Sequence, residues 1–229
     1  MKTIGLIGGS GWLSTVEYYS QINRLVNERL RGFQFAQILL YSLNFADIYS
    51  FIQNNQWKEL YKLLLAKAKM LESNHVDCIL LCANTLHIFA DELSENLSIP
   101  VIHIGVETAK ELKNKHITTV GLLGTKTTME GNFYRKKLEE NGLITLIPNV
   151  EERNYIQKII ETELLKGIFD DSSRNEFVKI MQSLKLQGAE AIILGCTEIP
   201  LLVQQQHFDL PLFDTLSIHA KAAVDFVVS

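Results

Sequence analysis

Two cysteines of this chain stand in matching settings that could support proton transfer. Cys82 opens the run Cys82-Ala83-Asn84-Thr85-Leu86-His87, and Cys196 lies within Gly195-Cys196-Thr197-Glu198. In both places an apolar stretch typical of a buried strand precedes the cysteine, and a hydroxyl residue follows it. A cysteine taken alone is more often a small buried hydrophobe, which is our interpretation of Cys78.

The neighbours of these cysteines are suited to binding an amino acid. Asn84 offers an amide and Thr85 a hydroxyl, beside backbone donors where a helix is expected to begin, and such groups bind carboxylates. Glu198 is an acid of the kind favoured at a helix start. It could instead hold a substrate ammonium or keep Cys196 protonated. We interpret His87 as a packing or orienting residue rather than a catalyst.

A glycine turn, Gly8-Gly9-Ser10-Gly11, joins the first expected strand to a helix. It lacks the third glycine of a dinucleotide-binding turn, and no acid ends the next strand. No Gly-Lys-Ser/Thr follows, so it is not a Walker loop. Two interpretations remain equally open: a cradle of backbone N–H groups for a carboxylate, and a turn that only lets the strand enter the helix.

The histidines give no sign of a metal site. The chain contains neither Cys-x-x-Cys nor His-x-x-x-His, and no metal-ligand spacing links the histidines at positions 75, 87, 103, 116, 207 and 219. We assign His219 to stabilising a terminal helix. A Cys–His hydrolase is an alternative, but two equivalent cysteines are not what an acyl-transfer site needs.

Composition limits the possible partners and location. The 229 residues carry a net charge of −4 with both signs scattered, which argues against a nucleic-acid partner. The opening Met1–Gly9 stretch is too short for a signal peptide and indicates a strand and turn. No stretch approaches the ~20 apolar residues of a membrane span. Cys78 and Cys82, ~13 Å apart on a strand, cannot form a disulfide. We expect reduced thiols and a cytoplasmic protein.

Short apolar runs alternate with helical patterns, which predicts an α/β fold with mainly parallel sheets. Helices are expected at Ser14–Leu30 and Lys58–Ser73, and Ser14-x-x-Glu17 and Ser173-x-x-Glu176 resemble capping boxes. The expected strands are Thr3–Ile7, Gln37–Ser42, Cys78–Leu81, Val101–Ile104, Thr118–Leu123 and Ala191–Leu194.

An internal echo links the two halves of the chain. Thr3-Ile4-Gly5-Leu6-Ile7-Gly8 returns as Thr119-Val120-Gly121-Leu122-Leu123-Gly124, 116 residues later, and Cys196 follows Cys82 by 114. Two echoes in similar register indicate two related α/β halves. Because ligands bind beyond the carboxyl ends of parallel strands, facing halves would place the cysteines across one cleft.

Two opposed thiols match the needs of a racemase. Inverting a stereocentre requires a base on one face and an acid on the other, and both directions must run. A free cysteine has a pKa of ~8.5, which helix N-termini would lower toward neutrality. The carbanion spreads its charge onto the carboxylate, where Asn84, Thr85 and Thr197 would stabilise it.

With these motifs, the chain resembles the aspartate/glutamate racemase family over essentially its whole length, and most closely its broad-specificity branch. The resemblance also includes Leu122-Leu123-Gly124-Thr125 and the run from Phe213 to His219. It implies racemisation of aspartate and/or glutamate without pyridoxal phosphate, no metal, and a homodimer. It also implies two pseudo-symmetric three-layer α/β domains, residues 1–98 plus 210–229 and residues 99–209. Cys82 and Cys196 would be the bases, and the substrate-binding residues would be Ser10, Gly11, Asn84, Thr85, Thr125, Thr197 and Glu198.

The resemblance also frames the open questions. Close relatives usually have Gly-Gly-Met-Ser-Trp where this chain has Gly8-Gly9-Ser10-Gly11-Trp12, beside the expected substrate pocket. Some aspartate racemases grip a carboxylate with a lysine in the region of Lys166. The alternatives are a maleate isomerase-like or hydantoin racemase-like enzyme of the same superfamily, and an amino-acid-binding protein without turnover. By resemblance, Cys82 takes the proton from the D-form and Cys196 from the L-form.

Overall fold

The computed structural model describes residues 1–228, which form two compact units. Unit 1 contains residues 1–103 and 219–228, and unit 2 contains residues 104–218. The observed boundaries therefore follow residues 103 and 218, whereas the sequence-based domains are divided after 98 and 209. That division into domains stays a prediction.

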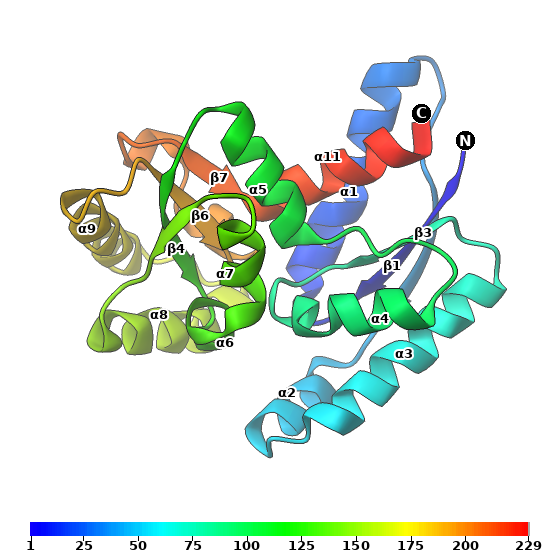
Figure 1. The fold of residues 1–229 in the computed structure, drawn as a ribbon, viewed down its shortest axis with the longest axis horizontal. Coiled ribbons are helices and arrows are strands. Elements are labelled where there is room, and N and C mark those ends of the chain that lie inside the picture. The colour runs from blue at the N-terminus through cyan, green and yellow to red at the C-terminus, as the bar shows by residue number, and fades with distance from the viewer. Residues whose placement is uncertain (229) are drawn as a thin grey trace. The chain divides into compact units, whose positions relative to one another are not determined.

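Unit 1 is built on a three-stranded parallel sheet (Figure 1). The order is β2-β1-β3, so the first strand lies in the centre, and Val101 adds a single parallel bridge to Ile79. Its elements are β1 (Thr3–Gly8), α1 (Trp12–Leu30), β2 (Gln37–Ser42), α2 (Phe45–Gln53), α3 (Trp57–Ser73), β3 (Cys78–Leu81), the 3-10 helix η1 (Thr85–Phe89), α4 (Ala90–Asn96) and most of α11 (Thr215–Val228).

Unit 2 repeats this order with one strand more, β5-β4-β6-β7, and all its pairings are parallel. Its elements are α5 (Ile104–Asn114), β4 (Thr119–Gly124), α6 (Lys126–Glu130), α7 (Asn132–Glu139), β5 (Ile144–Leu146), α8 (Val150–Thr162), the 3-10 helix η2 (Leu164–Lys166), α9 (Asp171–Leu186), β6 (Ala191–Gly195), α10 (Ile199–Leu202), the 3-10 helix η3 (Gln205–His207), β7 (Leu212–Asp214) and the start of α11.

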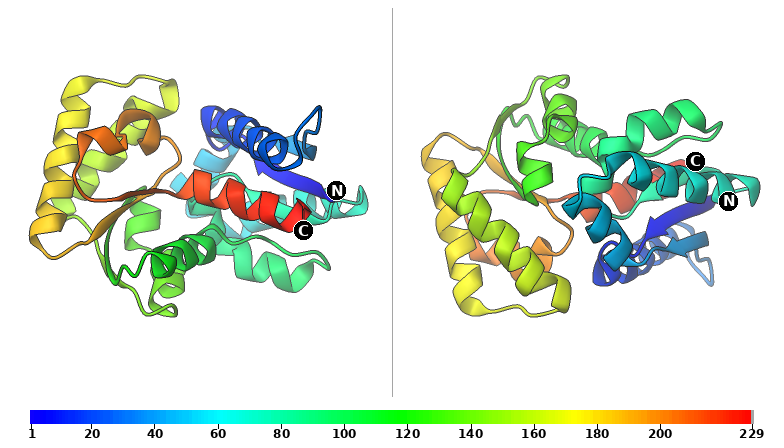
Figure 2. Two further views of the ribbon diagram at one scale, coloured as in Figure 1. Left: turned by 90° about the horizontal axis from the view of Figure 1, so that it is seen from above. Right: turned by 90° about the horizontal axis from the view of Figure 1, so that it is seen from below.

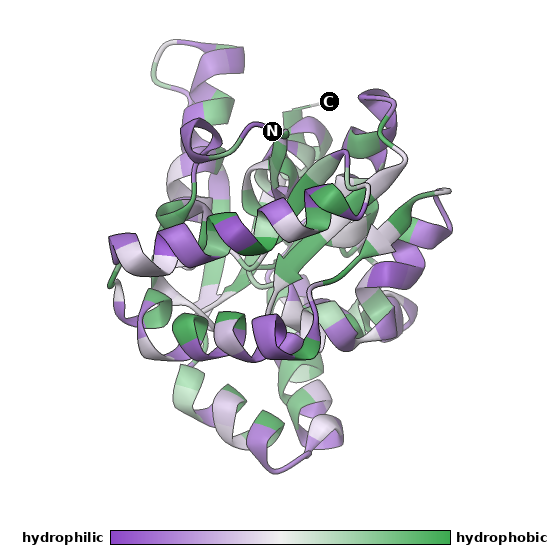
Figure 3. Ribbon diagram, turned by 90° about the vertical axis from the view of Figure 1, so that its left-hand side faces the viewer, coloured by the Kyte–Doolittle hydropathy of each residue, from purple (hydrophilic) through white to green (hydrophobic). Residues whose placement is uncertain are grey.

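Alternating strand residues make each unit a three-layer structure. In unit 2, Leu123 and Ile192 pack with α8 and α9, while Leu122 and Ile193 pack with α5 and α7. Both faces of the sheet are covered, as the continuous apolar runs of parallel strands require. Figure 3 shows the result, with green strands inside and helices that alternate between purple and green.

In unit 1, the side chains of Ile7 and Leu81 pack toward α3 and α4. The opposite face lies on the side of α1 and α11, which run side by side (Figures 1 and 2). Tyr18 and Arg29 of α1 bond to His219 and Asp225 of α11. The α/β class and the parallel sheets predicted from the sequence are confirmed.

The sequence prediction was wrong in a few elements. Val101 makes only a bridge, and Ile104 begins α5, so no strand covers 101–104. Strands β5 and β7, each three residues long, were missed.

Neither predicted capping box forms, because each serine lies inside a helix. Ser14 is buried in α1, whose N-cap is Gly11, and α9 is capped by Asp170. Capping boxes form elsewhere, between Asn149 and Glu152 at the start of α8 and between Gln204 and His207 at η3.

Candidate active site

In unit 1, the glycine turn and Cys82 leave the sheet from neighbouring strands. β1 and β3 pair in parallel with Ile7 opposite Leu81, and the backbone N–H of Cys82 donates to the Ile7 carbonyl at 2.9 Å. The segments that follow these two strands therefore begin at the same edge of the sheet. This edge carries four of the predicted site residues, Ser10, Gly11, Asn84 and Thr85, together with Cys82.

Backbone strain and a threonine shape the glycine turn. Gly9 has φ +91°, and a Cβ there would lie 2.0 Å from the Leu43 carbonyl oxygen, so only glycine fits. Thr15 Oγ1 accepts from the Gly9 N–H at 2.9 Å and donates to the Gly11 carbonyl at 3.0 Å. Ser10 Oγ is buried and makes no hydrogen bond within residues 1–228. The turn thus presents a hydroxyl without a protein partner near the start of α1.

Cys82 is fully buried at the start of its loop. Burial raises the pKa of its thiol well above the usual value. Asn84 is 3% exposed and Thr85 is half-buried. The element that follows is the five-residue 3-10 helix η1 rather than an α-helix.

Unit 2 repeats this arrangement at the ends of β4 and β6. These strands pair with Gly124 opposite Gly195, so Thr125 and Cys196 are the first residues beyond neighbouring strand ends. A Cβ on Gly195 would lie 2.7 Å from the Leu123 carbonyl, which explains the glycine before Cys196. The hydroxyl of Thr125 caps α6 and accepts from the Thr128 N–H at 3.2 Å.

Cys196 has a carboxylate partner. Its thiol donates to Glu198 Oε2 at 3.1 Å, and the Thr197 hydroxyl donates to the same oxygen at 3.0 Å. Burial is the main cause that raises the pKa of Cys196, and the Glu198 charge adds to it. Backbone N–H groups of Thr197 and Glu198 act in the opposite direction but do not outweigh these two causes.

The expectation that helix N-termini lower the thiol pKa values is therefore wrong. The elements that follow the two cysteines are short: η1 has five residues and α10 has four. Aligned peptide dipoles are correspondingly few, and desolvation of the thiolate dominates at both positions. In the protein alone, burial therefore favours the thiol over the thiolate at both positions. The pKa of Cys78 is also raised, to about 12, by burial and the nearby Asp77.

Three side chains in unit 1 take part in contacts that the sequence did not reveal. Tyr18 Oη lies 2.8 Å from His219 Nδ1, and His219 Nε2 lies 2.8 Å from the Ile102 carbonyl. His87 Nδ1 lies 2.9 Å from the Ala83 carbonyl, next to Cys82. Tyr134 follows Tyr18 by 116 residues, the same offset as the internal echo, and this spacing was a signal in the sequence. Both tyrosines are fully buried with hydrogen-bonded hydroxyls.

Lys166 does not join either group of site residues by any contact that the structure records. It is exposed at the end of η2, before Gly167 with φ +74°.

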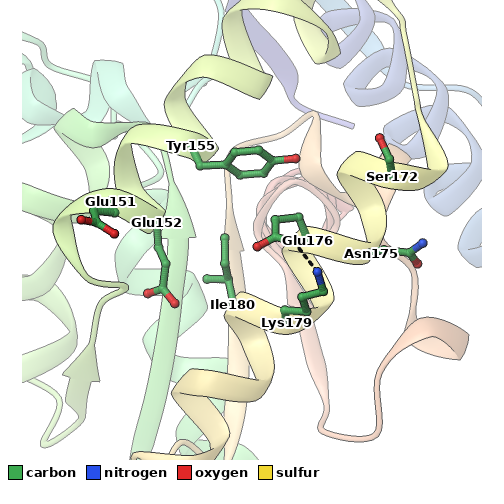
Figure 4. A pocket seen from close by; sticks show the side chains of 8 residues that line it. All are labelled: Glu151, Glu152, Tyr155, Ser172, Asn175, Glu176, Lys179 and Ile180. Carbon is green, nitrogen blue, oxygen red and sulfur yellow. Dashed lines mark hydrogen bonds and ion pairs between the residues drawn. The ribbon is translucent and has the colours of Figure 1, made fainter.

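Unit 2 also has an open groove of about 640 Å³ between α8 and α9 (Figure 4). No predicted site residue lines it. Its charged pair, Glu176 and Lys179, is joined by a 2.8 Å hydrogen bond. The lining residues are Glu151, Glu152, Tyr155, Ser172, Asn175, Glu176, Lys179 and Ile180.

Over residues 1–228, no three His, Cys, Asp or Glu side chains gather in a way that could hold a metal ion. Within the same range, no helix is both long and apolar enough to cross a membrane.

The fold, two α/β units with the same central strand order, is that of amino-acid racemases of known structure. The chain matches a candidate Asp/Glu racemase from Yersinia pestis at a TM-score of 0.93 and 40% identity, with both chains fully covered. It matches an aspartate racemase homologue from Pyrococcus horikoshii at a TM-score of 0.86 and 34% identity, again over both whole chains.

Sequence comparison identifies the family. The profile of the Asp/Glu/Hydantoin racemase family matches residues 7–223, and the chain belongs to this family. It is 29% identical to the broad specificity amino-acid racemase RacX of Bacillus subtilis over 169 residues, which cover 72% of this chain and 71% of RacX. Against the glutamate racemases it matches, the chain spans 51–62% of their length. The protein is an isomerase, an amino-acid racemase.

Proposed function

We propose that this enzyme racemises aspartate, glutamate or both by moving the α-proton between Cys82 and Cys196, without pyridoxal phosphate or a metal. One observation carries the proposal. Each unit has a buried cysteine directly after the strand that pairs with its central strand, β3 in unit 1 and β6 in unit 2. A single structural cysteine needs no such counterpart.

The proton balance of the reaction requires both thiols. One thiolate removes the α-proton, and the electron pair of the C–H bond moves into the carboxylate. The other thiol then gives its proton to the opposite face of the carbanion and becomes the thiolate. Because the enantiomers have equal free energy, the reverse path exchanges the two roles.

Because the pKa values of both thiols are raised, we assign to the bound substrate a role in forming the thiolate. An amino-acid ammonium close to a buried sulfur favours the thiolate by direct charge attraction. The ligand thus helps to generate the base that attacks it. We assign the binding of its carboxylates to the Ser10–Gly11 turn, Asn84, Thr85, Thr125 and Thr197, which offer hydroxyl, amide and backbone donors.

Glu198 is assigned to proton control at Cys196. Its carboxylate accepts the Cys196 S–H bond, which keeps this thiol protonated until a substrate arrives. We also assign the Glu198 carboxylate to binding the substrate ammonium, because an acidic group there attracts that charge. Cys82 has no corresponding charged group among the causes of its pKa shift, so proton handling differs between the two directions.

A chiral amino-acid panel tests the proposed function. Each L- and D-amino acid is incubated with the purified enzyme and EDTA, without pyridoxal phosphate, and the enantiomers are separated by chromatography. We expect racemisation of aspartate or glutamate. Turnover that requires added pyridoxal phosphate or metal would contradict the mechanism, and turnover of only a non-acidic amino acid would contradict the substrate class.

We also propose a homodimer formed through β2. This strand is an edge of its sheet and exposes Leu39 and Leu40, while Phe33 in the preceding loop is 97% exposed. Two copies related by a two-fold axis could pair these edges antiparallel and cover the apolar side chains. Sedimentation of wild type and Leu40→Lys tests this, and a wild-type monomer at micromolar concentration would contradict it.

The three free cysteines fit the reducing cytoplasm that we propose as its location.

A further inference from the structure

His87 is bonded to the segment that follows Cys82. Its Nδ1 lies 2.9 Å from the Ala83 carbonyl, and because a carbonyl only accepts, Nδ1 carries the hydrogen and donates. Its backbone N–H donates to the Asn84 carbonyl at 3.0 Å. His87 therefore fixes two successive carbonyls directly after the cysteine.

Two further imidazoles and a phenol surround this ring. The ring of His87 lies with its centroid 5.3 Å from that of His219, at an angle of 70°, and 5.1 Å from that of His103. His219 donates from Nε2 to the Ile102 carbonyl, so its Nδ1 accepts from the Tyr18 hydroxyl. The titratable groups that face His87 are thus His219 of α11 and His103, with Tyr18 of α1 behind His219.

The ring of His87 is neutral and has one unused atom. Burial lowers its pKa well below the usual value, and the neighbouring histidines add to this effect. With the hydrogen on Nδ1, Nε2 is an acceptor, and it is buried without a hydrogen bond within residues 1–228. Burying an unpaired polar atom is costly, so an apolar residue would fill this space at less cost. The contact that an apolar residue cannot make is the bond to the Ala83 carbonyl.

We propose that His87 is a positioning residue for Cys82. As a neutral imidazole it holds the Ala83 carbonyl and thereby fixes where the Cys82 backbone leaves the sheet, while Tyr18, His219 and His103 hold the ring. Its significance for catalysis rests on the proposed role of Cys82, but the contact itself is testable without any turnover.

Two substitutions separate the nitrogens of the ring. In His87→Asn the amide nitrogen can take the place of Nδ1 and keep the bond to Ala83. In His87→Gln the amide reaches toward the position of Nε2, and the Ala83 carbonyl loses its donor. His75→Asn is the matched control, because His75 is exposed and its φ of +60° is one that asparagine tolerates.

Thiol alkylation with iodoacetamide, resolved by mass spectrometry of the peptides, reports the position of Cys82. We expect His87→Gln to speed alkylation of Cys82 by about fivefold, the change that losing one ordinary hydrogen bond produces. His87→Asn and His75→Asn should stay within about twofold of wild type. Cys78, also fully buried in unit 1, is the internal control for general loosening.

Activity gives a second readout. His87→Gln should lower kcat with little change in KM, and His87→Asn should restore most of it. Parallel acceleration at Cys78 and Cys82 would show a merely structural role, and an unchanged Cys82 rate in His87→Gln would overturn the proposal. If His87→Gln does not fold, Tyr18→Phe, which removes the donor to His219, should accelerate Cys82 alone. Because labelling needs no substrate, an enzyme without racemase activity would refute the proposed function and leave this test intact.

Discussion

The loops after β3 and β6 occupy the same place in two similar sheets, yet their chemistry differs. The loop of Cys82 is held by a neutral histidine through a backbone carbonyl. The loop of Cys196 carries a buried carboxylate that bonds to the thiol itself. The two units thus share the position of the cysteine but differ in the groups that contact its loop. The two-base mechanism proposed above is compatible with this difference, because in it each cysteine attacks one enantiomer only.

Replacing either cysteine should have the largest effect, and it tests whether the two loops contribute equally to racemisation. Cys82→Ser and Cys196→Ser should each lower racemisation by about 1,000-fold or more, since serine is a far weaker acid and base partner at neutral pH. The measurement is chiral chromatography with the substrate that the panel identifies. Cys78→Ser is the matched control and should retain activity, because it lies inside β3 and has no counterpart in unit 2.

Deuterated water separates the two roles. In Cys82→Ser the remaining Cys196 should exchange the α-proton of the L-form, and in Cys196→Ser the remaining Cys82 that of the D-form. In wild type, early deuterium should appear mainly in the inverted product. A variant that racemises at nearly the wild-type rate would eliminate the two-base assignment, and early label in both enantiomers would point to a single base.

The carboxylate at Cys196 provides a sharper test of the difference between the loops. Glu198→Gln removes a charge that raises the pKa of Cys196, so the midpoint of its alkylation-versus-pH profile should fall, while that of Cys82 stays fixed. Racemisation should fall by about 100-fold, the lower end of the usual contribution of one acid–base group. Thr162→Ser, an exposed change in the same unit, controls for handling. An unchanged Cys196 profile would remove Glu198 from proton control.

We expect the buried histidines of unit 1 to make the folded protein less stable in acid. Burial lowers the pKa of His219 to about 3 in the folded protein, against ~6.5 when unfolded. Between these pH values the unfolded state binds more protons than the folded state. The contribution of His219 therefore lowers the free energy of unfolding as pH falls below about 6.5, and it is constant well above that pH.

Urea unfolding at pH 7.5, 6.5 and 5 measures this effect. His219 should contribute about 2 kcal/mol of the loss between pH 7.5 and pH 5, with a limiting slope of ~1.4 kcal/mol per pH unit well below pH 6.5. His219→Gln should therefore flatten the pH dependence, whatever its effect at pH 7.5. Parallel curves for His219→Gln and wild type would show that His219 is already charged in the folded protein.

The strands with strong apolar runs could be predicted from the sequence, but short edge strands and histidine partners could not. β1, β2, β3 and β6 match their predictions within a residue, because each contains a run of apolar residues, buried in β1, β3 and β6 and partly exposed in the edge strand β2. β5 and β7 have three residues each and carry no period long enough to detect.

In the candidate site, too, some features could be predicted from local sequence and others could not. The placement of Cys82 and Cys196 after strands follows from local sequence. The bond between Tyr18 and His219 joins residues 201 positions apart, and only packing of α1 against α11 brings them together. The thiol pKa values were predicted in the wrong direction, since burial, which depends on the whole unit, outweighs the local helix start.

The smallest expected effect concerns the glycine turn, which has no close equivalent in unit 2. There β4 is followed by Thr125, whose hydroxyl caps α6, whereas Ser10 Oγ is buried without a protein partner. A hydroxyl in that state is available to a ligand, and methionine at this position would fill the space with an apolar side chain instead. Ser10→Met should therefore change the ratio of kcat/KM for aspartate and glutamate by more than about twofold, or ~0.5 kcal/mol. Its midpoint of thermal unfolding should stay near that of wild type, because Ser10 is only partly buried and lies in a turn rather than in a hydrophobic core. Ser10→Ala separates the lost hydroxyl from the added bulk. If both variants keep every kcat/KM within twofold, Ser10 does not determine substrate preference, and the turn serves only to lead β1 into α1.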